Sequence, residues 1–327
     1  MREVNDMLRI AIIGCYYGRF PDWIQYWLKS CATNPTIDFF VVTDLNLSDL
    51  PENVHLIPLS LRDIKSLAEE KLGIPISLGK PYKLCDLKPC YGLIFEDYIK
   101  EYDYWGHCDF DLIWGDIRLF IDQYEIEKYD KFLPLGHLSL YRNTNETNNR
   151  FRLEGSKCGS YREAFSNDDG HAFDELDGIY SIYEKNHFPM FNKRIFAEIK
   201  TYHKRFCLKG IDGNYKHQAF FYKDGKVMRA YEEKGEIRTQ EYIYIHFRRK
   251  LPADKRDWRK LNDFYITKDG FFDLARLPKD ISEIERFNKN FGVFFETGET
   301  VKFIFRNMGE IKSKLKYELI ARRQKLN

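Results

Sequence analysis

The first third of the chain alternates apolar runs with polar, helix-compatible segments, and this pattern predicts a β-α-β arrangement. Leu8 to Gly14 is a continuous apolar run that ends in glycine, as expected of a parallel strand buried on both faces. A helix is predicted from Pro21 to about Ala32, and a second strand from Asp38 to Thr43. The apolar pattern therefore favours a sheet with a helical crossover.

The alternation of strands and helices continues as far as residue 108. Residues 55–59 are predicted as a short strand, and Ser60 with Asp63 forms a capping-box-like start for a helix that reaches Leu72. Helical segments at 83–88 and 90–100 and an aromatic strand at 102–108 follow. Together these elements predict an α/β protein with a Rossmann-like sheet and helices on both faces.

An acid pair follows the last of these predicted strands. Ligand sites in α/β sheets lie beyond the carboxyl ends of the strands, so Gly14, Asp44 and Asp109 are expected to cluster. Side chains two residues apart in an extended segment point the same way, so Asp109 and Asp111 would converge. Converging carboxylates suit Mg²⁺ or Mn²⁺ carrying a diphosphate. A turn with solvated acids would present the same residues, and the pattern alone leaves both readings open.

Basic residues near the acid pair are candidates for contacts with phosphate. Lys83 and Lys88, or the acid Asp86 between them, lie on a helix that must pack beside the strand bearing the acids, and a cation there would stabilise a diphosphate leaving group. Arg19, in the loop after the first strand, is a second candidate. Asp44 could accept hydrogen bonds from a nucleobase or ribose, or could cap a turn.

Two later segments carry further candidates. His246 lies in an apolar strand followed by a basic cluster, where it could be a core residue or complete a mixed oxygen and nitrogen metal site. Asp174 and Glu175 could supply a general base for an acceptor hydroxyl, although acids at a helix N-terminus would look the same.

The remaining segments are predicted from their composition. Residues 141–170 are polar and long for a structureless connection, which predicts a functional lid. Residues 206–231 alternate strand-like and turn-like pieces, and residues 242–247 form a strong strand. The basic tail from Val301 predicts an amphipathic helix that either packs on the protein or contacts anionic lipid.

Charge and cysteine content exclude several classes of protein. Lys and Arg total 52 against 50 Asp and Glu, so no nucleic-acid partner is expected. The seven cysteines are scattered and form no C-x-x-C pair, which argues against a disulfide framework or zinc knuckle and favours a reducing cytoplasm. No apolar stretch approaches roughly 18 residues, and no secretory signal is recognised. A cytoplasmic protein is expected, at most peripheral at the inner face of the membrane.

Several segments taken together resemble a known family. They are IIGCYYGRFPDW, VVTD, YKLCDLKPCYGLIF, YDYWGHCDFDLIWGDI and YIHFRRK. In this order they look like bacterial glycosyltransferases of the GT-A superfamily, of the type found in capsule and O-antigen biosynthesis. The resemblance covers about the first 250 residues, and it implies a catalytic domain at 1–250 followed by a partly helical, basic extension at 251–327.

The resemblance also implies the ligands and the residues that bind them. The donor would be a nucleotide-diphosphate sugar, most simply a UDP-sugar, and the metal would be Mn²⁺ or Mg²⁺ held by Asp109, Asp111 and His246. The expected donor contacts are Tyr16, Tyr17, Arg19, Asp44, Lys83, Asp86, Asp109, His137, Asn143 and Arg248. The acceptor would be a glycan or a lipid-linked oligosaccharide, and inversion or retention stays open.

Two alternatives belong to other functional classes. A haloacid-dehalogenase-like phosphatase would use Asp109 as nucleophile and Asp111 as acid and base, with Asp168 and Asp169 as later metal carboxylates. That family usually has its acid pair near the N-terminus and needs no β-α-β unit upstream of it. A non-catalytic carbohydrate-binding relative would explain the many aromatic residues but not the convergent acids and lysines.

Overall fold

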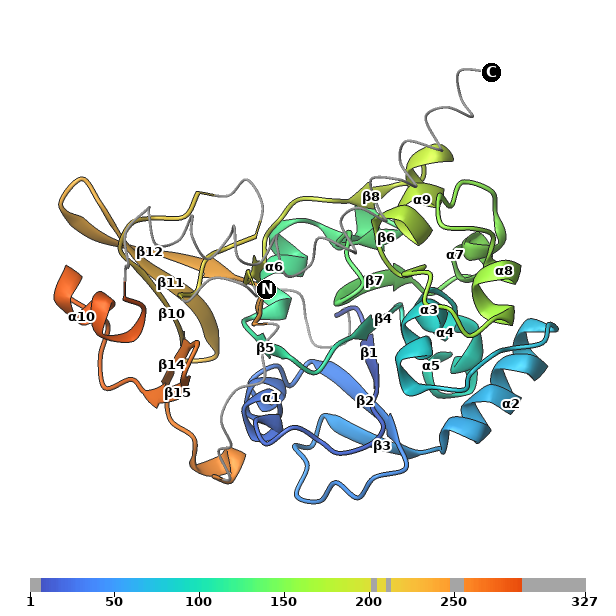
Figure 1. Cartoon of the computed structure of the whole chain (residues 1–327), viewed down its shortest axis with the longest axis horizontal. Helices are drawn as coiled ribbons and strands as arrows, with labels where there is room; N and C mark the ends of the chain where they lie inside the picture. The colour runs from blue at the N-terminus through green and yellow to red at the C-terminus, as the bar shows by residue number, and fades with distance from the viewer. Residues whose placement is uncertain (1–6, 201–204, 210–212, 248–255, 290–327) are drawn as a thin grey trace.

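The computed structural model describes residues 7–200, 205–209, 213–247 and 256–289. Within these residues the protein is a mixed α/β fold with a central, mostly parallel sheet of seven strands, as the sequence predicts. A five-stranded antiparallel sheet lies to one side of it, and a three-stranded sheet completes the strand pairing. Figure 1 shows most helices gathered around the central sheet and α10 beside the five-stranded sheet.

The central sheet is built around β1. In order across the sheet its strands are β3 (Val54–Pro58), β2 (Ile37–Thr43), β1 (Ile10–Cys15), β4 (Tyr104–Cys108), β7 (Leu138–Arg142), β6 (Lys131–Phe132) and β8 (Met190–Phe191). β1 pairs in parallel with both β2 and β4, so that Ile10 lies between Ile37 and Tyr104. The carboxyl ends of β1 and β4 therefore lie at the same edge of the sheet.

Helices cover both faces of the central sheet, and alternate residues of β1 accordingly pack into the cores on opposite faces. Ile10 and Ile12 belong to the core that includes α1 (Ile24–Ala32) and α6 (Ile117–Gln123). Ala11 and Ile13 belong to the core on the other face. The helices of that face are α2 (Leu61–Leu72), α3 (Leu84–Leu87), α4 (Tyr91–Ile94), α5 (Glu96–Ile99), α7 (Asn145–Asn149), α8 (Tyr161–Ser166) and α9 (Ser181–Lys185). The expected burial of the first strand on both faces is confirmed.

Several helix boundaries follow from local chemistry. The capping box predicted before α2 is present: Asp63 N–H donates to Ser60 Oγ at 3.2 Å, and Ser60 N–H donates to the Asp63 carboxylate at 2.9 Å. The two segments predicted as helical, 83–88 and 90–100, are each broken into short pieces, with 3₁₀ turns at Pro81–Lys83 and Lys88–Cys90. Further short turns lie at Ile126–Lys128, Arg150–Arg152, Leu176–Tyr180 and Trp258–Lys260.

The polar segment at 141–170 contains regular structure, and its predicted role as a functional lid stays a prediction. It contains the end of β7 and the helices α7 and α8, and Phe151 and Phe165 are buried in the core. Asn148 is buried too and accepts the Trp105 Nε1–H at 2.7 Å, so aromatic packing and a buried hydrogen bond both anchor these short helices.

The five-stranded sheet has the order β12 (Glu236–Tyr242), β11 (Lys226–Glu233), β10 (Gln218–Lys223), β14 (Phe264–Thr267) and β15 (Gly270–Asp273), and α10 (Ile281–Phe287) packs beside it. The three-stranded sheet has the order β5 (Leu112–Trp114), β13 (Tyr244–His246) and β9 (Ala197–Glu198). The expected strand at 242–247 is thus divided between β12 and β13.

The expected domain boundary near residue 250 stays a prediction. Strands from both sides of it, β10 and β14, pair in one sheet. Residues 248–255 and the basic tail at 301–327 lie outside the described residues, so Arg248 and the expected amphipathic helix receive no structural account. Within the described ranges, no helix combines the length and apolar character needed to cross a membrane, and all seven cysteines are free.

Candidate active site

Asp109 and Asp111 flank a buried aromatic residue in a bend that joins β4 to β5. The sequence predicts an extended segment here, but the structure has a bend instead. Phe110 is buried and packs against Trp27 and Tyr16, with ring centroids at 4.9 and 5.2 Å. A Cβ atom at position 14 would lie 2.7 Å from Phe110 Cζ, so a glycine is needed at the end of β1. The buried ring fixes the bend that carries the two carboxylates.

His246 joins the acid pair through strand pairing. β13 runs antiparallel to β5 and sets His246 opposite Leu112, one residue after Asp111. The Phe247 N–H donates to the Asp111 carbonyl at 3.2 Å, and His246 Nε2 lies 3.1 Å from Asp111 Oδ1. One ligand atom each from Asp109, Asp111 and His246 lie within 4.8 Å of one another.

This trio fits a divalent cation. Burial raises the pKa of Asp111, but the charge and hydrogen bond of His246 outweigh it and hold the pKa of Asp111 below its usual value. The carboxylate is therefore ionised and available as a ligand at neutral pH. Two carboxylates and one imidazole are donors that Mn²⁺ accepts, and Mg²⁺ accepts the carboxylates.

Lys88 bridges the acid pair and a second pair of acids. Its ammonium lies 2.7 Å from Asp109 Oδ1 and 3.0 Å from Asp174 Oδ2, and it donates to the Gly136 carbonyl at 2.9 Å. Burial lowers the pKa of Lys88, but the charges of Asp109 and Asp174 outweigh this effect and raise it well above the usual value. Lys88 is therefore a fixed cation at the site.

Asp174 and Glu175 lie beside Lys88. Burial raises the pKa of Asp174 to about 6, although the charge of Lys88 opposes the shift. A Cβ atom at position 136 would lie 2.3 Å from Asp174 Oδ2 and 3.1 Å from Glu175 Oε1, so the absence of a side chain at Gly136 makes room for both acids. Asp174 is thus a carboxylate that changes protonation close to neutral pH.

These groups line one cavity of about 810 Å³ at the carboxyl ends of β1 and β4. Of the residues predicted to bind donor or metal, six lie on its wall: Tyr16, Asp86, Asp109, Asp111, His137 and His246. Asp174 and Glu175 lie there as well. Asp86 also accepts the backbone N–H groups of His171 and Phe173, at 3.1 and 2.9 Å, and so holds the chain that leads to Asp174.

Other predicted donor contacts lie away from this cavity wall. Lys83 is buried and pairs with Asp86 at 2.9 Å, so it positions the chain behind the wall while Lys88 reaches the acids. The Tyr17 hydroxyl donates to the Leu59 carbonyl at 2.7 Å, and Asn143 Nδ2 donates to the Ile99 carbonyl at 2.8 Å.

Two charged candidates also lie outside the wall. Arg19 is exposed and pairs with Asp22 at 3.0 Å. Asp44 is exposed, in a bend after β2, and neither it nor Gly14 lines the cavity with Asp109. The structure therefore does not bring Arg19 or Asp44 to the acid pair.

The cavity wall also contains residues that the sequence did not single out. Arg194, Glu198 and Lys209 form an ion-paired group on it, with Lys209 Nζ 3.0 Å and Arg194 Nη1 3.4 Å from Glu198. Tyr82 is 78% exposed and also lines the cavity. Nothing in the local sequence marks Glu198 and its two partners, because the place of Glu198 depends on how β9 pairs with β13.

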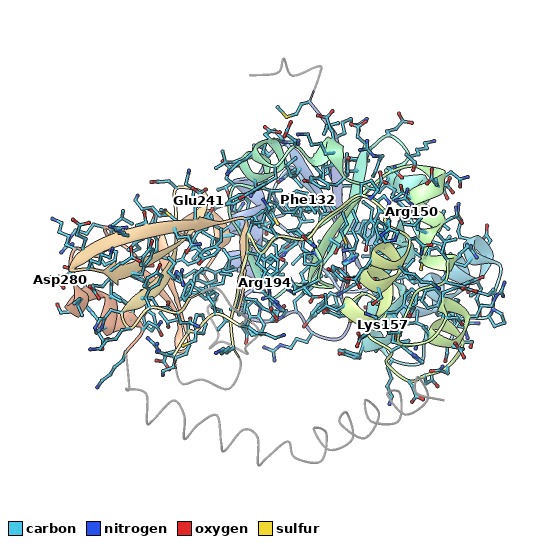
Figure 2. The ribbon with its side chains drawn as sticks, turned by 90° about the horizontal axis from the view of Figure 1, so that it is seen from above. Phe132, Arg150, Lys157, Arg194, Glu241 and Asp280 are labelled. Carbon is cyan, nitrogen blue, oxygen red and sulfur yellow. The ribbon has the colours of Figure 1, made fainter. Side chains whose placement is uncertain are left out.

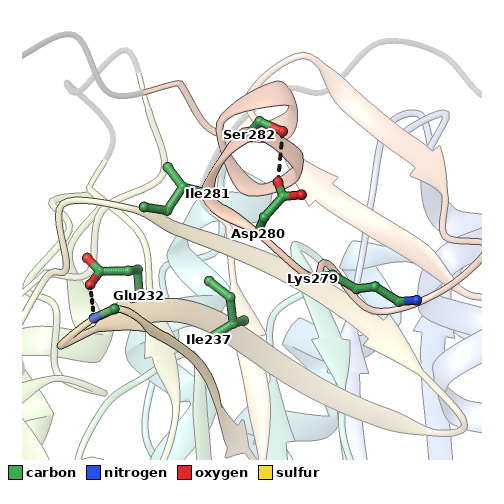
Figure 3. A pocket seen from close by; sticks show the side chains of 7 residues that line it. Glu232, Ile237, Lys279, Asp280, Ile281 and Ser282 are labelled. Carbon is green, nitrogen blue, oxygen red and sulfur yellow. Dashed lines mark hydrogen bonds between the residues drawn. The ribbon is translucent and has the colours of Figure 1, made fainter.

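A smaller cavity of about 360 Å³ lies between β11, β12 and α10 (Figure 3). Its two acidic side chains accept hydrogen bonds from neighbouring residues. Glu232 accepts from the Gly235 N–H at 2.8 Å, and Asp280 accepts from the Ser282 hydroxyl at 2.7 Å. Among the described residues, the side chains grouped as metal ligands all line the large cavity instead. The large cavity is therefore the candidate active site.

Fold and cavity together define an α/β protein with an acidic, histidine-containing site at the carboxyl ends of its central strands. The chain belongs to the family DUF6625, a family of unknown function, whose model matches residues 12–275. A comparison with curated proteins finds no match.

Among solved structures, the protein is similar to three glycosyltransferases. The apo form of mouse xyloside xylosyltransferase 1 has a TM-score of 0.37 and 8% identity, over 59% of this chain and 88% of that one. The galactosyltransferase LgtC, solved with donor and acceptor sugar analogues, has a TM-score of 0.32 and 12% identity, over 57% and 75%. The apo form of the glycosyltransferase GlyE from Streptococcus pneumoniae TIGR4 has a TM-score of 0.33 and 12% identity, over 57% and 46%.

Proposed function

We propose that this protein is a metal-dependent glycosyltransferase. It would move a sugar from a nucleoside-diphosphate donor, most simply a UDP-sugar, to a hydroxyl of a glycan or lipid-linked acceptor in bacterial surface polysaccharide biosynthesis. The observation that carries the proposal is the convergence of Asp109, Asp111 and His246 in a large cavity into which the Lys88 ammonium also reaches. The sequence resemblance supplies the choice of donor and pathway class.

The end of the cavity that contains Asp109 and Asp111 would receive the donor diphosphate. Asp109, Asp111 and His246 would hold a divalent cation, which when bound stabilises the negative charge that develops on a departing diphosphate. Lys88 is held in place by Asp109, Asp174 and the Gly136 carbonyl, so its positive charge is fixed beside the proposed diphosphate position. Tyr16 stacks on Phe20 with ring centroids at 5.0 Å and presents an aromatic wall to the same end of the cavity.

The second pair of acids would receive the acceptor. When the acceptor hydroxyl oxygen forms its bond to the anomeric carbon, the hydroxyl proton must leave, and Asp174 or Glu175 would take it. With a pKa of about 6, Asp174 is mostly ionised at pH 7 and still basic enough to accept a proton. This role belongs to an inverting transfer, and a retaining transfer would leave the two acids to bind the sugar.

The phosphatase alternative lacks support from the same geometry. Its later metal carboxylates, Asp168 and Asp169, do not line the large cavity in the described part of the chain. Asp168 instead accepts the Ser77 hydroxyl, and the Asp169 carbonyl accepts from Lys83. The acid pair therefore has no second set of carboxylates from this segment.

The test is a panel of nucleotide sugars incubated with the protein and Mn²⁺, with slow hydrolysis of the donor as the signal. One donor should be cleaved, and Mn²⁺ with the matching nucleoside diphosphate should raise the melting temperature. Asp111→Asn should lower the hydrolysis rate by about 100-fold or more and remove the thermal shift. Asp168→Asn is the matched control and should keep both.

Other outcomes would count against the proposal. Hydrolysis of p-nitrophenyl phosphate without any nucleotide sugar, lost in both Asp111→Asn and Asp168→Asn, would favour phosphatase chemistry. Glycan binding measured by calorimetry without metal or nucleotide, together with no donor cleavage, would favour a binding protein.

A further inference from the structure

A second group of potential metal ligands lies behind the acid pair. β13 runs parallel to β9 with His246 beside Glu198, and His137 directly precedes β7. One ligand atom each from His137, Glu198 and His246 lie within 4.8 Å of one another. The three residues are 3%, 3% and 7% exposed. This group is therefore buried and richer in nitrogen than the acid pair.

The hydrogen bonds around the two histidines determine where their lone pairs lie. A proton on His246 Nε2 donates toward Asp111, 3.1 Å away, and puts the lone pair on Nδ1. His246 Nδ1 is buried and has no hydrogen-bond partner among the described residues. A buried nitrogen without a partner is costly, so a ligand at this position has a physical reason.

The other two side chains are oriented by neighbours. His137 Nδ1 lies 2.8 Å from the Tyr244 hydroxyl, and a proton on Nδ1 that donates to it puts the lone pair on Nε2. Glu198 is held by Lys209 and Arg194. A carboxylate has about four acceptor positions, so these ion pairs are compatible with a metal bond. Partners of this kind fix the orientation of metal ligands.

We propose that His137, Glu198 and His246 form a second cation site, selective for a borderline metal such as Zn²⁺. Two imidazoles and one carboxylate are a common ligand set for Zn²⁺, with a fourth position open to water or substrate. Arg194, Glu198 and Lys209 line the large cavity, which gives the cation a path of entry. Figure 2 labels Arg194 near the middle of the molecule, between the central and the five-stranded sheets.

The proposed site does not depend on glycosyl transfer. Both groups of ligands contain His246. A cation bound by one group therefore changes how His246 can bind a cation in the other. The acid pair offers carboxylate oxygens, which suit Mg²⁺ and Mn²⁺. The group of His137, Glu198 and His246 offers mainly nitrogen. Zn²⁺ is therefore expected to bind even where the acid pair has been neutralised.

The test measures Zn²⁺ affinity by competition with a chromophoric chelator, using full-length protein without a histidine tag. His137→Gln and Glu198→Gln should each weaken binding by about tenfold or more. The double variant Asp109→Asn with Asp111→Asn should keep its affinity within about threefold, and His55→Ala, an exposed histidine paired with Asp38, is the matched control. Circular dichroism shows which variants fold. If His137→Gln does not fold, the Zn²⁺ affinity of Glu198→Gln decides the test.

Cobalt absorption identifies the ligands independently. Co²⁺ in the wild-type protein should give visible bands of nitrogen and oxygen ligation, without the near-ultraviolet band of thiolate ligation. Loss of Zn²⁺ binding in the Asp109 and Asp111 double variant, a thiolate band, or unchanged affinity in Glu198→Gln would each overturn the proposal. So would no Zn²⁺ binding at all. None of these results depends on whether a nucleotide sugar is cleaved.

Discussion

At the scale of single residues, the sequence predicted the acids, the histidine and two candidate lysines, but not which lysine reaches the acids. Lys83 and Lys88 are five residues apart, which puts them about 140° apart on an ideal helix. Only one of them could face the acids, and periodicity could not say which because the segment is broken into short turns. The structure turns Lys88 toward Asp109 and Lys83 toward Asp86.

Lys88 can be tested by removing its charge. Lys88→Met should lower any donor cleavage by about 100-fold or more, because Asp109 and Asp174 lose their shared cation. Thermal stability should fall too, since two carboxylates are left without their buried partner. Lys80→Met, on the exposed residue before the same turn, is the matched control. Equal activity in both variants would remove Lys88 from the mechanism.

The raised pKa of Asp174 predicts a pH dependence. Burial raises this pKa from 3.8 to about 6, so the carboxyl is protonated below pH 6 and becomes a competent base above it. The value of kcat/KM should therefore rise as the pH increases through about 6. Asp174→Asn should lose most of the activity and this acidic limb. A wild-type profile that stays flat between pH 5 and 7 would exclude Asp174 as the base.

At the scale of elements, strands and capped helices were predictable because their signals are local. The buried run of β1, the second strand and the capping box of α2 all appear where the sequence indicates them. The acid bend and the short helices at 145–166 were not predictable, because a few buried aromatic residues such as Phe110 and Phe151 fix them through contacts with distant segments.

The capping box of α2 gives a quantitative prediction. Ser60→Ala should lower the free energy of unfolding by about 1 kcal/mol, because the Asp63 N–H loses its side-chain acceptor. Ser60→Thr should retain most of the stability, since threonine is also an N-cap residue and keeps the hydroxyl that donates to Asp63. Urea unfolding measures both variants. A loss in Ser60→Thr as large as in Ser60→Ala would contradict the capping role of the hydroxyl.

At the scale of the whole molecule, the five-stranded sheet shares a core with helix α1 and with the three-stranded sheet. Tyr26 of α1 and Ile113 of β5 belong to the same buried cluster as residues of β10, β14 and β15. Tyr26 stacks on Phe271 with ring centroids at 3.8 Å and meets Phe264 edge-on at 4.7 Å. A shared core of this kind couples the unfolding of the five-stranded sheet to that of α1, which packs on the central sheet.

Tyr26→Ala tests this coupling. The variant should lose about 3–5 kcal/mol of stability, and the protein should still unfold in one transition. Circular dichroism and tryptophan fluorescence should report the same midpoint. Tyr98→Ala is the matched control, because Tyr98 is 43% exposed, and it should change stability by less than about 0.5 kcal/mol. Two separate transitions in the wild-type protein would contradict a common core.

The sequence by itself determined the succession along the chain of the first four central strands and the position of Asp109 and Asp111 after β4, because apolar runs and caps act over a few neighbouring residues. Only the tertiary structure decided which lysine reaches these acids and how Glu198 and His137 meet His246. It also decided that strands on both sides of residue 250 share one sheet. These arrangements depend on pairing between segments far apart in the chain, and local patterns contain no information about such pairing.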